Sequence, residues 1–192
     1  MYEPFLPQQP TPARAEVHSV EWLFEPFWPG TRLLVRHDAG RISMLHADGA
    51  VPDELSSVLG PGLSAAAAVV DGVWTTLVAG DVGAFVAVDL LELDGKPLLD
   101  VPLQERRRLL DSVVVPGERV RLSPLVKHPA DGWLRSWRSA GFTHYLAKHQ
   151  NGRYSSGAQA DDWLKLDLRG PRGGGILDHL VGSRTRTRHI GD

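Results

Sequence analysis

The chain has 192 residues, 42% of them hydrophobic, which is enough for one medium-sized domain with its own core. A formal net charge of -2 excludes a strong overall field that would draw the protein to nucleic acid or acidic lipid. The absence of cysteine excludes disulfides, thiolate catalysis and cysteine-ligated metals. The opening MYEPFLPQQPTPAR lacks the apolar stretch of a signal peptide, and no run approaches the roughly 20 apolar residues of a membrane span. We therefore expect a soluble, cytoplasmic protein.

The first part of the chain predicts an arm followed by strands. Residues 1–19 are rich in proline and glutamine and are predicted to form an extended arm. Residues 22–27 alternate in a way that predicts a strand. Two runs, 31–37 and 41–46, flank Asp38-Ala39-Gly40, which is typical of a β-hairpin.

The next segments predict a helix and a second hairpin. A short helix is expected over 52–59, with Asp53 as its N-cap. The runs 66–70 and 74–78 flank Asp71-Gly72-Val73. Polar and glycine residues between two apolar runs indicate a turn, so these runs are expected to form the second hairpin.

The middle of the chain predicts a buried strand and a helix. Residues 84–91 (AFVAVDLL) are continuously apolar, which indicates a strand buried on both faces, and the turn 93–95 ends it. Residues 101–115 predict a helix with one apolar face, and Arg106 to Arg108 are expected on its solvated face. A further strand is expected over 120–126.

The last predicted helix, 131–140, carries Trp133 and Trp137 on one stripe. This spacing favours core packing of both rings over a platform for stacking nucleic-acid bases. Strands are expected over 143–147 and 163–168. Because strands outnumber helices and hairpins join many of them, the fold class is α+β with a mostly antiparallel sheet.

The chain divides into an arm (1–19), a domain (20–169) and a Gly- and Arg-rich tail (170–192). The simpler interpretation of the tail is a solvated chain terminus. The functional alternative is that its basic residues contact phosphate groups of a nucleic acid. The residues that would make that contact are Arg184, Arg186 and Arg188.

No metal site or cofactor is predicted. His144 and His149 are five residues apart and would face opposite sides of a strand, so a surface role is favoured for both. No nucleophile elbow or phosphate-binding glycine loop occurs in the right setting.

Four segments carry motifs in a fixed order. Residues 22–32, WLFEPFWPGTR, match the pattern E-P-K-W-D-G-x-R at most positions, and residues 85–110 match a central strand and its following helix. Residues 121–126 and 141–168 match two final motifs, E-G-V-V-A-K and W-L-K-x-K. Together, over roughly 3–168, they resemble the adenylation (nucleotidyltransferase) domain of ATP-dependent DNA ligases, closest to the ligase domain of bacterial end-joining ligases.

The resemblance implies two mostly antiparallel sheets with flanking helices and a nucleotide cleft between them. The family normally continues into an oligonucleotide-binding barrel, and we expect none within these residues. In the family the motif lysine attacks the α-phosphate of ATP, but Phe27 stands at that position. A phenyl ring has no lone pair to attack phosphorus, so this covalent route is closed there.

Other positions of the same cleft also depart from the family. Each substitution removes a group that the resemblance assigns to the nucleotide or its metal. They are Pro29 for the motif aspartate, Val73 for the ribose-binding glutamate, Val88 for the adenine-stacking aromatic, Thr143 for the metal-binding glutamate, His144 for the following glycine and Asp167 for the final lysine.

Some residues of the cleft are retained. Glu25 and Arg32 flank the changed lysine position, while Lys148 and Lys165 stand where the family has phosphate-contacting lysines. Either lysine could replace the missing nucleophile, but loss of the metal and sugar ligands argues against it. The structural alternative is that both lysines form ion pairs with neighbours such as Asp161 or Asp167.

These departures favour a catalytically inactive ligase-like domain that acts by binding DNA, RNA or a protein partner. One alternative is a repurposed enzyme whose more apolar cleft, lined by Phe27, Trp28, Val73, Val88 and Tyr145, takes a non-nucleotide small molecule. In that case Glu25 or His144 would be the acid or base. A second alternative is a sensor that binds ATP without reacting.

Overall fold

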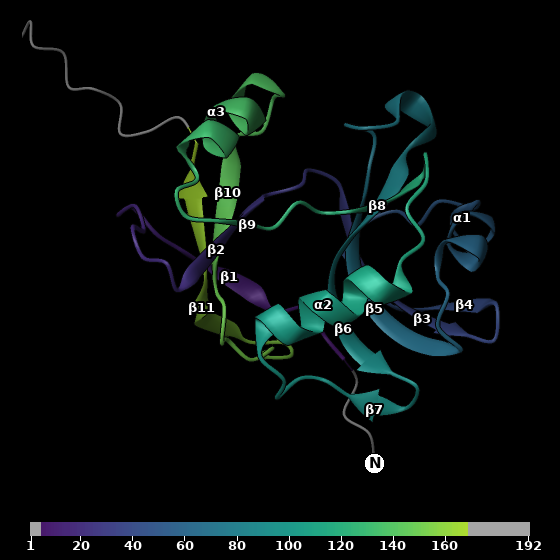
Figure 1. Ribbon diagram of the computed structural model, residues 1–192. Helices are drawn as coiled ribbons and strands as arrows, with labels where there is room; N and C mark the ends of the chain where they lie inside the picture. The colour runs from purple at the N-terminus through teal and green to yellow at the C-terminus, as the bar shows by residue number, and fades with distance from the viewer. Residues whose placement is uncertain (1–4, 169–192) are drawn as a thin grey trace, which may run out of the picture.

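The computed structural model describes residues 5–168, so the predicted tail and its three arginines lie outside the described residues. These residues form two β-sheets and three α-helices, and the predicted α+β class is confirmed (Figure 1). The helices are α1 (Leu55–Gly62), α2 (Leu103–Val113) and α3 (Asp131–Ser139), with a short 3₁₀ turn at Gly80–Val82.

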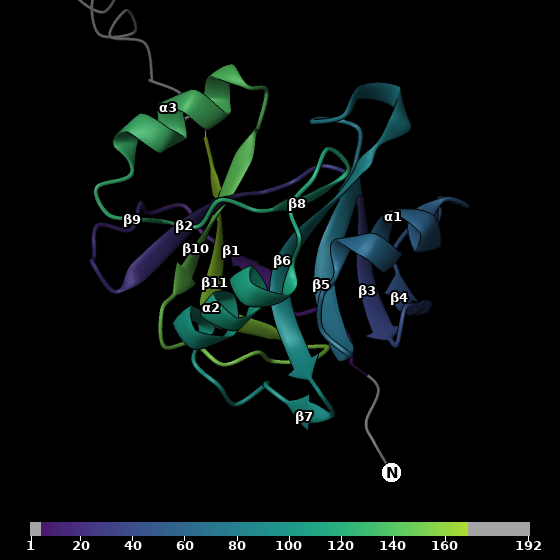
Figure 2. The ribbon, with the colours of Figure 1, turned by 45° about the vertical axis from the view of Figure 1, so that its right-hand side comes forward.

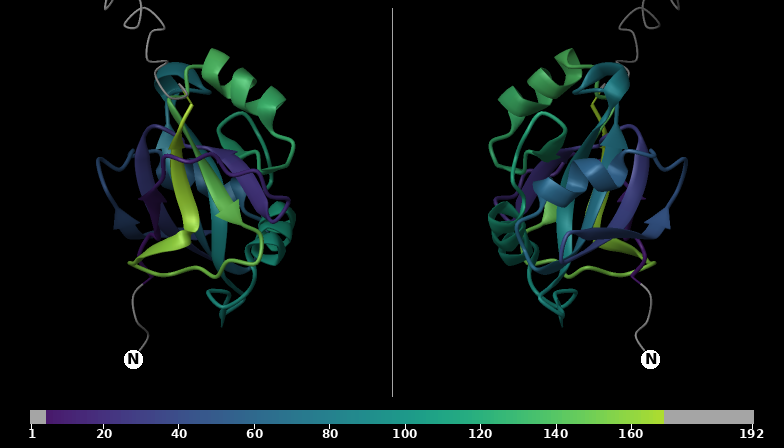
Figure 3. Two further views of the ribbon diagram at one scale, coloured as in Figure 1. Left: turned by 90° about the vertical axis from the view of Figure 1, so that its left-hand side faces the viewer. Right: turned by 90° about the vertical axis from the view of Figure 1, so that its right-hand side faces the viewer.

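The first sheet, sheet A, has the strand order β1-β11-β10-β2-β9 and is seen face-on in Figure 3, left. Strand β1 runs parallel to β11, and the other pairs are antiparallel. The predicted N-terminal arm thus supplies an edge strand. The strands are β1 (Gln9–Pro12), β2 (Trp22–Pro26), β9 (Val126–Lys127), β10 (His144–His149) and β11 (Gln159–Asp167).

The second sheet, sheet B, has the order β4-β3-β5-β6-β7, with β8 pairing in parallel with β6. The predicted β3–β4 hairpin is present, and its turn residues Ala39 and Gly40 have φ of 47° and 83°. The strands are β3 (Thr31–Asp38), β4 (Arg41–Ala47), β5 (Ala67–Thr75), β6 (Ala84–Leu93), β7 (Lys96–Pro97) and β8 (Val120–Leu122).

Strand alternation divides the core into layers. In β3, Leu33 packs in the cluster that includes α1 and α2, whereas Leu34 packs in a cluster with Trp163 of sheet A. On the far face of sheet A, Phe24 and Tyr145 pack with Trp137 of α3. Sheet B therefore lies between α1 and sheet A, and α3 covers the far face of sheet A (Figure 2). Helix α2 packs on sheet B and also reaches sheet A, where Arg107 faces Glu25 of β2.

The predicted hairpin at Asp71-Gly72-Val73 is wrong, because β5 runs straight through these residues. Asp71 tolerates full burial since its carboxylate binds Arg32. Gly72 is required by close packing rather than by a turn: a Cβ atom there would lie 2.2 Å from the ring of Phe85.

The predicted solvated face of α2 is wrong for two of its three arginines. Arg106 is fully buried, and its Nη2 lies 2.8 Å from the Asp89 carboxylate of β6. Arg107 is largely buried and faces Glu25 at 3.6 Å. Only Arg108 lies in solvent, paired with Glu105. Tertiary ion pairs therefore override the helix pattern.

Two boundary predictions also fail. The strand expected over 120–126 is instead two strands, β8 and β9, which belong to different sheets. Pro124 lies in the segment between them, and it lacks the backbone N–H that a strand donates to its neighbour. Helix α1 starts at Leu55, later than expected, and its N-cap is Glu54 rather than Asp53.

The two tryptophans of α3 differ in burial. Trp137 is 5% exposed and packs in the core, as predicted, whereas Trp133 is 48% exposed. Core packing of Trp133 was therefore the wrong expectation. Within residues 5–168, no helix has the length and apolar character that crossing a membrane would require.

The buried pair between Arg106 and Asp89 should contribute strongly to stability. We expect Arg106→Met to lower the free energy of unfolding by about 3–5 kcal/mol, because Asp89 would remain buried without a counter-charge. Urea denaturation measures this loss. Arg108→Met is the control and should change little, since its ion pair is exposed.

Removing both charges distinguishes the ion pair from simple packing. Arg106→Met combined with Asp89→Leu should be more stable than Arg106→Met alone, because no isolated charge is left buried. A single Arg106→Met variant as stable as the wild type would contradict this role.

The buried phenol of Tyr145 is expected to make the free energy of unfolding decrease at alkaline pH. Burial, together with the charge of Glu16, raises the pKa of Tyr145 from 10.0 to about 12. The stabilisation is complete below pH 10 and is lost as pH rises toward 12, because the unfolded chain releases the phenolic proton first. The free energy of unfolding should thus fall less steeply over this range in Tyr145→Phe than in wild type. Parallel curves for the two proteins would refute the assignment.

Candidate functional site

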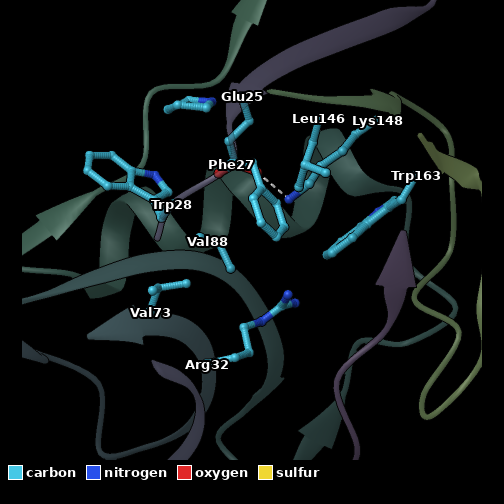
Figure 4. A pocket seen from close by; sticks show the side chains of 10 residues that line it. Glu25, Phe27, Trp28, Arg32, Val73, Val88, Leu146, Lys148 and Trp163 are labelled. Atoms are coloured by element: carbon cyan, nitrogen blue, oxygen red, sulfur yellow. Dashed lines mark ion pairs between the residues drawn. The ribbon is translucent and has the colours of Figure 1, made fainter. Parts of the chain in front are cut away.

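The space between the two sheets forms the candidate site. Its centre, called here the inner pocket, is a cavity of only about 20 Å³, which is room for about one water molecule. Strands from both sheets contribute to its wall (Figure 4). The lining residues are Glu25, Pro26, Phe27, Trp28, Arg32, Val73, Val88, Leu146, Lys148 and Trp163.

Phe27 fills the middle of this space. It follows β2, and its backbone N–H donates to the carbonyl of His144 at 3.1 Å, which extends the β2–β10 ladder by one bond. Its side chain points between the sheets (Figure 4). Beyond it, Trp28 Nε1 donates to Ser123 Oγ at 2.8 Å and so fixes the turn to the segment between β8 and β9.

Glu25 and Lys148 form a buried ion pair on one wall. Both are 1% exposed, and they lie on the neighbouring strands β2 and β10. The Lys148 ammonium also sits 3.8 Å from the centre of the Trp163 ring. Arg107 adds a second cation at 3.6 Å from Glu25. The Lys148 ammonium is thus held within the wall of the pocket.

Arg32 forms the opposite wall. Its Nε and Nη2 atoms each donate to Asp71 at 2.5 Å, in a bidentate pair. Burial acts to lower the pKa of Arg32, but the charge of Asp71 and these hydrogen bonds outweigh it and hold the pKa above its usual value. Arg32 therefore stays charged and tied to Asp71.

Tyr154 links this pair to the N-terminal strand region. Its hydroxyl donates to Asp71 at 2.8 Å and accepts from the backbone N–H of Gln8 at 2.9 Å. Burial, and next the charge of Asp71, raise the pKa of Tyr154 well above its ordinary value. A continuous chain of hydrogen bonds thus connects the segment before β1 with Arg32.

A second cavity, the outer pocket, lies on the other side of Phe27. It has a volume of about 380 Å³ and shares Phe27, Trp28 and Arg32 with the inner pocket. Lys165 of β11 places its ammonium 3.7 Å from the centre of the Phe27 ring, and burial lowers its pKa. The wall also includes Pro7, Gln9, Pro10, Pro12, Pro29, Gly30, His46, Asp48 and Val73.

The structure gathers most of the sequence-predicted cleft residues. Glu25, Arg32, Val88 and Lys148 line the inner pocket, and Lys165 lines the outer one. The remaining predicted residue lies beside these pockets: the His144 ring is centred 6.4 Å from that of Phe27.

The substituted positions fall in the same region. Val73 lines both pockets, and Pro29 lines the outer one. Thr143 is exposed, and its hydroxyl lies 2.9 Å from Nδ1 of His144. Asp167 ends β11, directly across from His144 in the sheet register.

Three interpretations of cleft residues change with the structure. Tyr145 does not line the cleft, because alternation in β10 turns it toward Phe24 on the far face. Lys148 is paired with Glu25 rather than with a nearby aspartate. Trp163, which the sequence analysis missed, faces the cleft, and its two-residue spacing from Lys165 was the signal that could have revealed it.

Among residues 5–168, no three His, Asp or Glu side chains gather closely enough to hold a metal ion. The inner pocket offers one carboxylate and two cations, and all of them are engaged in ion pairs. Each ion pair joins neighbouring strands of one sheet, Glu25 and Lys148 in sheet A and Arg32 and Asp71 in sheet B, so this arrangement stabilises the two walls of the pocket.

Comparison with known proteins agrees with this geometry. A family model for the ATP dependent DNA ligase domain matches residues 79–167. The multifunctional non-homologous end joining DNA repair protein LigD of Mycobacterium tuberculosis (strain H37Rv) is 29% identical over 170 residues, covering 79% of this chain. A probable DNA ligase of Mycobacterium sp. (strain KMS) is 38% identical over 79 residues, or 41% of this chain. The chain spans 22% of that LigD protein and 15% of that ligase.

Solved structures show the same fold. Mycobacterial DNA ligase D complexed with ATP and MES superimposes with a TM-score of 0.66 at 25% identity, covering 85% of this chain and 60% of that one. The ligase domain of M. tuberculosis LigD gives a TM-score of 0.63 at 24% identity, with 84% and 58% covered. In sequence and in fold, the chain is similar to the adenylation domain of ATP-dependent DNA ligases, with LigD ligase domains among its relatives.

Proposed function

We propose that this chain is a ligase-like domain that does not transfer a nucleotidyl group and that works by binding a partner. The observation that carries the proposal is the Phe27 ring, which fills the inner pocket, at the position that the resemblance assigns to the family's nucleophilic lysine. Its ring leaves an inner pocket of about 20 Å³. Ligand pockets typically measure about 300–1,000 Å³, so the inner pocket is too small for a nucleoside.

Neither nearby lysine offers a substitute nucleophile in the inner pocket. The Lys148 ammonium is committed to Glu25 and to the face of Trp163. Lys165 lines the outer pocket, with its ammonium over the ring of Phe27. The resemblance assigns Thr143 to the position of the family's metal-binding glutamate, and its hydroxyl cannot supply the charge that a carboxylate gives to Mg²⁺.

A nucleic-acid partner is the better supported kind of partner. The relatives carry names that place them in DNA repair and DNA ligation. Arg184, Arg186 and Arg188 lie outside the described residues and add cationic groups to the chain beyond Leu168. Phosphate contacts from such residues weaken steeply with salt, because binding releases counterions.

The outer pocket favours a second candidate function. Its volume of about 380 Å³ is in the range of small-molecule sites. Lys165 could hold an anion there, and His144 lies near the same phenyl ring. A non-nucleotide ligand in this pocket would agree with a repurposed enzyme.

An adenylation assay tests the main proposal. The purified chain, incubated with α-labelled ATP and Mg²⁺, should form no covalent adduct on a denaturing gel, while the ligase domain of M. tuberculosis LigD serves as the positive control. We expect Phe27→Lys to remain unlabelled as well, since Val73 and Thr143 still lack the sugar and metal ligands. A labelled wild-type band would overturn the proposal.

A further inference from the structure

Trp133 is an exposed aromatic side chain that the fold does not use. It lies in the first turn of α3 and is 48% exposed, whereas Trp137, one turn later, is 5% exposed. The two rings are 6.3 Å apart and tilted by 41°. Trp137 therefore supports one side of Trp133 and restricts its motion, while about half of the Trp133 surface stays in water.

The neighbours of Trp133 leave its ring accessible. At 3.6 residues per turn, the exposed residue of α3 closest to Trp133 in the next turn is Ser136, and the residue before Trp133 is Gly132, so both neighbours are small. Each is exposed. No bulky side chain of α3 therefore shields that flank of the ring from a planar ligand.

The remaining exposed groups of α3 are mainly cationic. Arg135 and Arg138 are both exposed, and the acidic residue of the helix is Asp131 in its first turn. Trp133 is the large apolar side chain that α3 exposes among the described residues. A protein-docking face would need an apolar patch around such an anchor, whereas a nucleobase needs one ring, with cations for the phosphates.

The chain leaves the described domain at the same corner. Leu168 packs in the cluster that contains Trp137, and its N–H donates to Thr143 at 2.9 Å. The sequence that follows Leu168 contains Arg169, Arg172, Arg184, Arg186 and Arg188. These five arginines follow Leu168 in the sequence, although the whole chain carries a net charge of -2.

We propose that α3 is a binding surface for single-stranded nucleic acid, with Trp133 as a stacking platform for a base and Arg135 and Arg138 as phosphate contacts. This inference rests on the binding function proposed above and names its surface and its partner. A single strand fits because its bases are free to stack, whereas the bases of a duplex present only their edges. Stacking on one ring is tolerant of sequence, so little base preference is expected.

The test uses the full chain and a fluorescein-labelled strand of 12 thymidines, with binding followed by fluorescence anisotropy at about 50 mM salt. Trp133→Ala should weaken binding by about 5- to 150-fold, the range found for loss of one base–aromatic stack. Trp133→Phe should retain most of the affinity, since a phenyl ring still stacks. Leu45→Ala is the matched control, because Leu45 is 38% exposed on β4 and lies far from α3 in the sheet order.

Salt dependence tests the phosphate contacts separately. Arg135→Gln and Arg138→Gln should each reduce the slope of log affinity against log salt by about 0.7, the value for one phosphate contact on a single strand. Trp133→Ala should leave this slope unchanged. Thermal unfolding of each variant should match the wild type, because all three residues are exposed.

Three outcomes would overturn the inference. They are no binding of the strand by the wild type at about 50 mM salt, equal affinity of wild type and Trp133→Ala, and equal or tighter binding of the matching duplex. Unchanged affinity in Trp133→Ala would instead favour an apolar protein partner as the ligand of the exposed ring. An ATP adduct would instead overturn the proposed loss of nucleotidyl transfer, so the two failures are distinguishable.

Discussion

Two buried aspartates on neighbouring strands set the constraint on which this fold depends. Asp71 of β5 lies directly opposite Asp89 of β6, and both are fully buried. Two adjacent carboxylates in a low-dielectric interior require counter-charges, which Arg32 and Arg106 supply. Because Tyr154, from the segment between β10 and β11, donates to Asp71, the same carboxylates also join sheet B to sheet A.

This electrostatic frame explains why charged side chains line the cleft although they are buried. Arg32 is occupied by Asp71, and Lys148 is occupied by Glu25. Removing Arg32 would leave Asp71 buried without a counter-charge, which is costly, and removing Lys148 would leave Glu25 with only the more distant Arg107. The ion pairs of Arg32 and Lys148 therefore agree with a structural role for both residues, while Phe27 takes the space between the sheets.

A filled cleft moves the candidate binding surfaces to the outside of the molecule. The outer pocket holds Lys165 against the Phe27 ring, and α3 exposes Trp133 and, elsewhere on the same helix, two arginines. Both surfaces combine an aromatic ring with a cation, the pairing that suits ligands with a planar and an anionic part. They lie on different layers, so each can be altered by mutation without disturbing the other.

The sequence by itself predicted the ligase-like architecture, from its resemblance to the family in the order of the motifs, and most strand positions, from local periodicity. It placed Asp71 in a turn and Arg106 in solvent, since polar residues are usually exposed and their partners are distant in sequence. Only the tertiary structure brought Arg32 to Asp71 and Asp89 to Arg106. It alone also decided that Trp133 is exposed while Trp137 is buried, because helical spacing places both rings on one stripe and only the edge of the packed layer separates them.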